Sequence, residues 1–208
     1  MRCYLIRHAQ TVWNRDNRFQ GRTDSALSPL GVRQAECLGA HFAGRPVGAI
    51  YSSALARTVR TAQAIAGRVG VAAAVEPGLA EMDLGQWEGL TPQEIDARFS
   101  GAFQAWRVKP SSVTIPDGEP PRAFHERVRG AFTRVASRHR ERELVVVTHG
   151  GAIASLLADW LHADYDRMLS QLVINNAGVS AVEWQPSSPA VLWVNSIAHL
   201  DPTLIATD

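Results

Sequence analysis

One unbroken apolar run, Leu144-Val145-Val146-Val147, restricts the fold more than any other feature of this sequence. A strand with one wet face alternates apolar and polar residues, whereas a strand that is apolar throughout is typical of a parallel sheet covered on both faces. The run is followed by His149-Gly150-Gly151 and by an apolar segment to about Trp160, a pattern that indicates a helix. We therefore expect a parallel sheet at the centre of the protein.

Other strands and helices alternate along the chain. Short β-prone runs predict further strands at residues 2–6, 48–52, 72–75, 177–184 and 191–196. Helical periodicity and helix-start signals predict helices at residues 29–42, 55–69, 92–106 and 121–140. This alternation predicts an α/β fold in three layers (α/β/α) around a mostly parallel central sheet.

Residues 1–208 are expected to form a single domain, because no repeat, linker or low-complexity segment divides them. Residues 85–140 connect two expected strands and are too long for a simple crossover. We expect them to form a small helical cap over one edge of the sheet. The aromatic residues of this cap either pack in its core or form a wall against a substrate: Trp87, Phe103 and Trp106.

The composition excludes several kinds of chemistry. Of the 21 basic residues, 20 are arginine and one is Lys109, which precedes a proline in a loop-like stretch. No lysine is therefore placed for a P-loop, and a Schiff-base enzyme would have Lys109 alone to use. The formal net charge of +1 argues against nucleic acid or an anionic membrane as a partner.

Cysteine usage and the N-terminal sequence indicate a cytoplasmic protein. Cys3 and Cys37 lie in apolar patterns and form no CxxC pair, as expected of small buried side chains in a reducing compartment. Arg7 and His8 interrupt the first apolar run, so it does not resemble a signal peptide. No apolar stretch reaches the 18 residues that a transmembrane helix needs.

Charged residues follow the expected strands at the positions where α/β sheets bind ligands, beyond the carboxyl ends. Arg7 and His8 end the first strand, Arg57 opens the helix after the second, and His149 follows the central run. Glu81 lies in a turn-like segment between them in sequence. Two arginines and two histidines at one sheet edge would form an electropositive pocket that suits a phosphate dianion.

These residue types suit phosphoryl transfer. Positive neighbours disfavour imidazolium, so a histidine among arginines keeps its lone pair free to attack phosphorus. An acid such as Glu81 would protonate the leaving alkoxide if its carboxyl were held neutral near pH 7. The structural alternatives are a polar strand end for the histidines, an exposed helix position for Arg57 and a solvated turn for Glu81.

Ordered blocks of the sequence resemble the histidine phosphatase superfamily, also called the phosphoglycerate mutase-like family. The first block, at residues 5–14, contains the family's Arg-His-Ala-x-Thr element from Arg7 to Thr11. The other blocks follow in the family's order and with suitable spacing, at residues 18–31, 51–58, 81–89, 117–119 and 146–151. The resemblance covers most of the chain and implies the same α/β fold.

The resemblance also implies roles for the matched residues. His8 would attack phosphorus and become phosphohistidine, while Arg7, Arg57 and His149 would hold the phosphoryl oxygens. Glu81 would be the proton donor and then the base that activates water. Further residues would contact the phosphoryl group or line the pocket: Asn14, Gln20, Gly21 and Gly150. Such enzymes need no metal or other cofactor, because arginines and histidines supply the positive charge.

Phosphatases and mutases of this family differ in whether water or a second phosphorylated substrate accepts the phosphoryl group. The mutases carry a longer, basic insertion between the positions of Glu81 and His149, whereas the segment here is short and holds one lysine. We therefore expect a phosphatase of small phosphomonoesters, such as phosphoserine, α-ribazole 5′-phosphate or phosphoglycerate-type sugar phosphates. Phosphoserine phosphatases carry a histidine at the position of Leu84, and this departure weakens the phosphoserine interpretation.

Two alternatives stay open at this point. One is a cofactor-dependent phosphoglycerate mutase, and the other is a catalytically silent protein that binds phosphorylated ligands as a regulator. An edge strand near the C-terminus would allow a homodimer. His199 is a further candidate, because the C-terminal segment in this family can approach the pocket.

Overall fold

A six-stranded sheet with the order β3-β2-β4-β1-β5-β6 forms the centre of the protein. The structure is a computed structural model that describes residues 1–139, 141–185 and 188–205. Strands β1, β2, β3 and β4 are parallel, β5 is antiparallel to β1, and β6 is antiparallel to β5. The strands are β1 (Arg2–Arg7), β2 (Val47–Ser52), β3 (Ala73–Val75), β4 (Glu143–Thr148), β5 (Val179–Glu183) and β6 (Ala190–Ser196).

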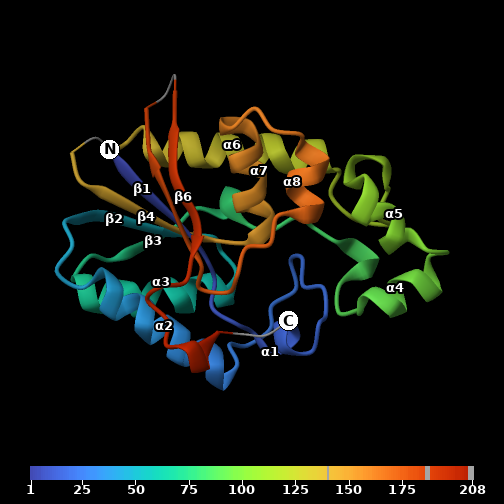
Figure 1. Cartoon of the computed structure of the whole chain (residues 1–208), viewed down its shortest axis with the longest axis horizontal. Helices are drawn as coiled ribbons and strands as arrows, with labels where there is room; N and C mark the ends of the chain where they lie inside the picture. Colours follow the sequence, from blue (N-terminus) through green and yellow to red (C-terminus); the bar gives the residue numbers. More distant parts are fainter. Residues whose placement is uncertain (140, 186–187, 206–208) are drawn as a thin grey trace.

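Helices cover both faces of this sheet (Figure 1). One face packs against α6 (Pro121–Ala136) and α7 (Gly150–Trp160), and the other packs against α2 (Pro29–Phe42) and α3 (Ala56–Val69). Side chains of β4 alternate between the two cores, with Leu144 and Val146 on the α6 and α7 side and Val145 on the other. The apolar run therefore lies between two cores, and the predicted three-layer fold is confirmed.

The cap differs from the expected one in extent and in its helices. Residues 92–106 form two helices, α4 (Pro92–Arg98) and α5 (Ala102–Val108), because Ser100 and Gly101 have positive φ angles. Asp96 stabilises this break by accepting the backbone N–H groups of Phe103 and Gln104. Helix α6 belongs to the layer on the sheet, so the cap ends before it, and the range 85–140 was too long.

Most other element boundaries lie within a few residues of the expected ones. Helix α6 ends at Ala136 rather than near Arg140, which lies outside the described residues. Two helices were not predicted, the one-turn α1 (Val12–Arg15) and α8 (Tyr165–Gln171), which packs against α5 and α7. Short 3₁₀ helices complete the chain: η1 (Pro77–Leu79), η2 (Gly85–Trp87), η3 (Pro110–Ser112) and η4 (Pro202–Leu204).

Strand β6 occupies one edge of the sheet, and β3 occupies the other. The pairing of two chains through the edge near the C-terminus stays a prediction. Over the described ranges, no helix combines the length and the apolar character that crossing a bilayer requires.

The core between the sheet and α6 provides a test of the fold. Phe132 is fully buried, and the ring centroids of Trp160 and Trp184 each lie 5.0 Å from its own. We expect Phe132→Ala to lower the free energy of unfolding by about 3–5 kcal/mol, because it leaves a cavity between packed aromatic rings. Urea denaturation measures this loss. The exposed Val32→Ala on α2 is the control and should stay within about 0.5 kcal/mol; equal losses in both variants would contradict the packing.

Candidate active site

Parallel pairing brings three strand ends to the same edge of the sheet. Arg7 of β1 pairs with Thr148 of β4, and Ser52 of β2 pairs with Val147. The residues after these strands continue the pattern, because His8 N–H donates to the Thr148 carbonyl at 2.9 Å. His8, His149 and the start of α3 are thereby held together, as the strand-end rule predicts.

His8 is buried at the floor of a cavity of about 430 Å³. Its Nδ1 lies 2.8 Å from the Ala9 carbonyl oxygen, which can only accept a hydrogen bond. Nδ1 therefore carries the hydrogen, and Nε2 carries the lone pair. Burial, with Arg57 and Arg7 nearby, lowers the pKa of His8 well below its ordinary value of 6.5. The imidazole is neutral and has a free lone pair near neutral pH.

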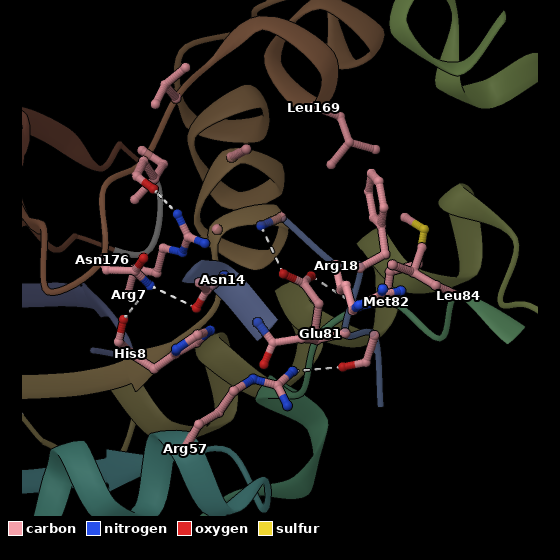
Figure 2. A pocket seen from close by; sticks show the side chains of 18 of the residues that line it. Arg7, His8, Asn14, Arg18, Arg57, Glu81, Met82, Leu84, Leu169 and Asn176 are labelled. Carbon is pink, nitrogen blue, oxygen red and sulfur yellow. Dashed lines mark hydrogen bonds between the residues drawn. The ribbon is translucent and has the colours of Figure 1, made fainter. Parts of the chain in front are cut away.

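Two guanidinium groups flank His8 (Figure 2). Arg57 is fully buried, and its two terminal nitrogens donate to the carbonyl oxygens of Gly21 and Thr23 and to Asp24. Arg7 donates from Nη1 to the Ile174 carbonyl at 2.5 Å. Backbone oxygens hold both guanidinium groups, and the Asp24 carboxylate also pairs with Arg57 at 3.2 Å, so both groups are fixed beside His8.

His149 lies beside His8, with ring centroids 5.3 Å apart. It is wholly buried and stands behind the residues that line the cavity. Its Nε2 is 2.8 Å from Ser53 Oγ, which in turn lies 2.7 Å from Thr58 Oγ1. Burial is the main cause that lowers the pKa of His149 well below 6.5, and Arg57, His8 and Arg7 add to it.

Two buried nitrogen atoms of the residues around His8 lack hydrogen-bond partners. In the described part of the chain, five buried side-chain nitrogen or oxygen atoms have no hydrogen-bond partner, and Arg57 Nε and His149 Nδ1 are two of them. Buried polar groups in folded proteins are rarely left unpaired, so such atoms call for a ligand or a solvent partner. An anion bound at His8 could accept a hydrogen bond from Arg57 Nε. If Ser53 donates to His149 Nε2, the ring hydrogen is on Nδ1, and the same anion could accept from His149 Nδ1.

Glu81 reaches the same cavity from the loop after η1. One of its carboxylate oxygens accepts the Met82 N–H at 3.0 Å, and the other accepts the Gly151 N–H at 3.1 Å in the first turn of α7. A Cβ at Gly151 would lie 2.6 Å from the Glu81 carboxylate, so glycine is required for this approach. Gly150 precedes it at the N-terminus of α7, where the helix dipole favours an anion.

The predicted amide residues lie on the cavity wall with their oxygens already engaged. Asn14 Oδ1 accepts from the Thr11 N–H and from Asn176 Nδ2. Gln20 Oε1 accepts from the Thr11 hydroxyl at 2.9 Å. The NH₂ groups of both amides are therefore the ends available to a ligand. Thr11 caps α1 and positions both residues, which explains the function of that one-turn helix.

Gly21 belongs to a loop that supports Arg57. Its φ angle is +54°, and a Cβ there would lie 2.0 Å from a carboxylate oxygen of Glu88. That carboxylate accepts the backbone N–H groups of Arg22, Thr23 and Leu84. Glu88 therefore fixes the loop whose carbonyls hold the guanidinium of Arg57.

The sequence is matched by a family model described as "Histidine phosphatase superfamily (branch 1)" over residues 3–197. Among relatives, phosphoserine phosphatase 1 of Hydrogenobacter thermophilus is 31% identical over 94% of this chain and 92% of its own. A Yersinia pestis protein named "Probable phosphoglycerate mutase GpmB" is 31% identical over 97% of this chain and 95% of its own.

The chain belongs to the histidine phosphatase superfamily.

Solved structures agree with this assignment. Bacillus stearothermophilus YhfR superposes with a TM-score of 0.90 at 28% identity, covering 95% of this chain and 98% of that one. A mycobacterial glucosyl-3-phosphoglycerate phosphatase, solved with VO3, superposes with a TM-score of 0.84 at 30% identity, covering 94% and 99%. The resemblance seen in the sequence is confirmed, and the protein is an enzyme of the phosphatase class.

The histidine phosphatase site includes residues that sequence reasoning did not single out. Asn176, from the loop before β5, lines the cavity and donates to the His8 carbonyl at 3.1 Å. Ser53 contacts His149, and Glu88 accepts hydrogen bonds from the loop that holds Arg57, but neither residue lines the cavity. Ser53 and Glu88 lie in matched family blocks, which was the available signal, whereas Asn176 lies outside them.

Two other candidates take different places in this histidine phosphatase. His199 packs against His41 of α2, with tilted rings whose centroids are 5.1 Å apart, and does not line the cavity. Of the cap aromatics, Trp87 is fully buried in the core, whereas Trp106 lines the cavity. Among the described residues, no group of three or more His, Cys, Asp or Glu side chains is arranged to hold a metal ion. Metal independence stays a prediction.

The close approach of Gly151 in α7 to Glu81, the expected proton donor, predicts that a methyl group added at position 151 lowers activity. Gly151→Ala should displace the Glu81 carboxylate and lower kcat toward p-nitrophenyl phosphate about tenfold or more, because proton transfer depends on its position. Gly67→Ala is the matched control, since its new Cβ in α3 meets no atom within 4 Å. Unchanged kcat in Gly151→Ala would show that Glu81 does not need this position.

The buried histidines predict a pH dependence of stability. His8 and His149 resist protonation when folded, whereas in the unfolded chain they titrate near 6.5. As pH falls below about 6.5, protons bind the unfolded chain first, so the free energy of unfolding should decrease. His149→Gln removes one such group and should flatten the slope between pH 6 and 5 by up to about 1.4 kcal/mol per pH unit. Urea titrations at several pH values measure both slopes, and equal slopes would contradict the neutral burial of His149.

Proposed function

We propose that this histidine phosphatase hydrolyses small phosphomonoesters through a phosphohistidine at His8, without a metal ion. The observation that carries the proposal is a neutral imidazole with its Nε2 lone pair free, near two buried nitrogens that lack partners, Arg57 Nε, which is a donor, and His149 Nδ1, which is one when Ser53 donates to Nε2. Donors around a nucleophile are the arrangement that phosphoryl transfer requires, because the transferred group carries charge on its equatorial oxygens.

In the first step, Nε2 of His8 forms a bond to phosphorus as the bond between phosphorus and the ester oxygen breaks. Arg7, Arg57, His149 and the amide of Asn14 bind the phosphoryl oxygens. The protonated carboxyl of Glu81 gives its proton to the leaving alkoxide, which departs as the alcohol.

In the second step, Glu81 takes a proton from water, and the oxygen of that water attacks the phosphorus. The bond between phosphorus and His8 Nε2 breaks, which returns the imidazole and releases inorganic phosphate. Arginines and histidines supply the positive charge throughout, so the step sequence needs no metal ion.

The nucleophile is tested by substitution. His8→Ala should lose roughly a thousandfold or more of the kcat toward p-nitrophenyl phosphate, measured in EDTA. His139→Ala is the control, because this histidine contacts Tyr51 and does not line the cavity. Rapid quenching of the wild-type enzyme at high pH should trap an acid-labile phosphohistidine. Substantial turnover in His8→Ala would overturn the assigned nucleophile, and loss of wild-type activity in EDTA would overturn metal independence.

The same preparation separates the alternatives. Formation of 2-phosphoglycerate from 3-phosphoglycerate with a bisphosphate primer, faster than phosphate release, would indicate a mutase. Phosphate binding without turnover or phosphohistidine would indicate a silent regulator. We expect the enzyme to release inorganic phosphate with turnover, and to do so faster than it forms 2-phosphoglycerate.

A further inference from the structure

We propose that the site selects monoesters whose alcohol part is apolar and carries no second negative charge. This inference rests on the phosphatase function proposed above and names its substrate class. Figure 2 shows the two ends of the cavity, with Arg7, His8, Asn14 and Arg57 on one side and Leu169, Met82 and Leu84 on the other. The phosphoryl group occupies the first end, so the alcohol part faces the second.

The wall at the second end is built almost entirely from hydrocarbon and aromatic side chains. Met82, Leu84 and Trp106 contribute from the segment after Glu81 and from α5, and they are buried. Helix α8 and the residue after it add Leu169 and Leu172, which are partly buried across the cavity. Such a surface favours an apolar group that displaces water and gives a polar group no partner.

The charges around the cavity argue against a second anion. Beyond Arg7 and Arg57, Arg18 is the one cationic residue in the described lining. Its Nη1 donates to the Gly89 carbonyl at 2.6 Å and to Glu94 at 2.9 Å, so its charge is already paired. Glu81 is the acidic residue of the described lining and adds no positive charge for a second anion. A carboxylate or second phosphate at the apolar end would lose water without gaining a free cation.

The uncharged polar residues of the lining do not change this conclusion. Asn176 Nδ2 donates to the His8 carbonyl and to Asn14 Oδ1, and Gln20 bonds to Thr11, which bonds to Asn14, so these amides lie at the phosphoryl end. Asn17 is exposed at the rim. An amino acid ester such as phosphoserine would place its ammonium and carboxylate groups against the Leu84 and Leu169 side of the cavity.

The test compares esters whose leaving alcohols are alike. Ethyl phosphate, 2-phenylethyl phosphate and O-phosphoserine are all esters of primary alcohols. They differ chiefly in the group that the alcohol part places against the apolar end of the cavity. We expect kcat/KM for 2-phenylethyl phosphate to exceed that for O-phosphoserine by about tenfold or more, with ethyl phosphate between them. A kcat/KM for O-phosphoserine equal to or above that for the phenylethyl ester would overturn the proposal.

Charge added to the wall should reverse this preference. Leu169→Arg should lower kcat/KM for 2-phenylethyl phosphate and raise it for O-phosphoserine, so that their ratio falls about tenfold. Leu192→Arg makes the same exchange on β6, where the leucine is 42% exposed and outside the cavity, and should change none of the three. Leu172→Arg is the second variant if Leu169→Arg fails to fold. An unchanged ratio in a folded wall variant would overturn the proposal.

Binding of phosphonates separates this inference from the phosphatase function itself. Calorimetry with 3-phenylpropylphosphonate and 2-amino-4-phosphonobutyrate, which mimic the two larger esters, needs no turnover. Tighter binding of the phenyl compound would support the apolar end of the cavity even if no ester is hydrolysed. The absence of hydrolysis would overturn the proposed phosphatase function and leave the binding preference standing. Equal or weaker binding of the phenyl compound would overturn the substrate class, whatever the hydrolytic activity.

Discussion

The parallel pairing of β4 with β1 on one side and β2 on the other is the constraint on which the site depends. It places His8, Ser53 and His149 at one level, because carbonyls of β4 accept the N–H groups of His8 and Ser53. A shift of one residue in this register would turn the His8 side chain to the opposite face. The apolar residues of β4 lie in cores on both faces, so such a shift would also misplace its packing. Core packing and catalytic geometry are therefore fixed by the same hydrogen bonds.

The preference for arginine has a structural meaning at Arg57. Both of its terminal nitrogens are bound to the loop of residues 21–24, yet Nε remains without a partner and beside His8. A guanidinium can bind the protein and a phosphoryl group at once, because its donors point in several fixed directions. A lysine has a single ammonium nitrogen, which could not bind the carbonyls of residues 21–24 and a phosphoryl group in the same fixed geometry. Their own burial is the main cause that lowers the pKa of His8 and of His149, and the nearby Arg57 charge adds to it, which preserves the neutral nucleophile.

The sequence indicated the parts of the structure that are encoded locally. The apolar run, the strand ends and the helix-start signals predicted the sheet, its covering helices and the place of His8 and His149. It did not reveal α8 or the role of Asn176, whose importance arises from tertiary contacts with α7 and with the His8 carbonyl. The break between α4 and α5 also depends on a side chain, Asp96, that bonds to the backbone of the following helix. Apolar periodicity alone therefore predicts one continuous helix at residues 92–106.

The same division explains why the chemistry is easier to predict than the substrate. The phosphoryl end is carried by residues within or just after regular strands, where hydrogen-bond register fixes each position. The distal end is assembled from the segment after Glu81, from α5 and from α8, three parts of the chain that meet only when the cap packs on the sheet. Their relative placement follows from apolar contacts, which have no direction and tolerate many arrangements. A family can therefore keep one reaction while each member changes the alcohol that it accepts.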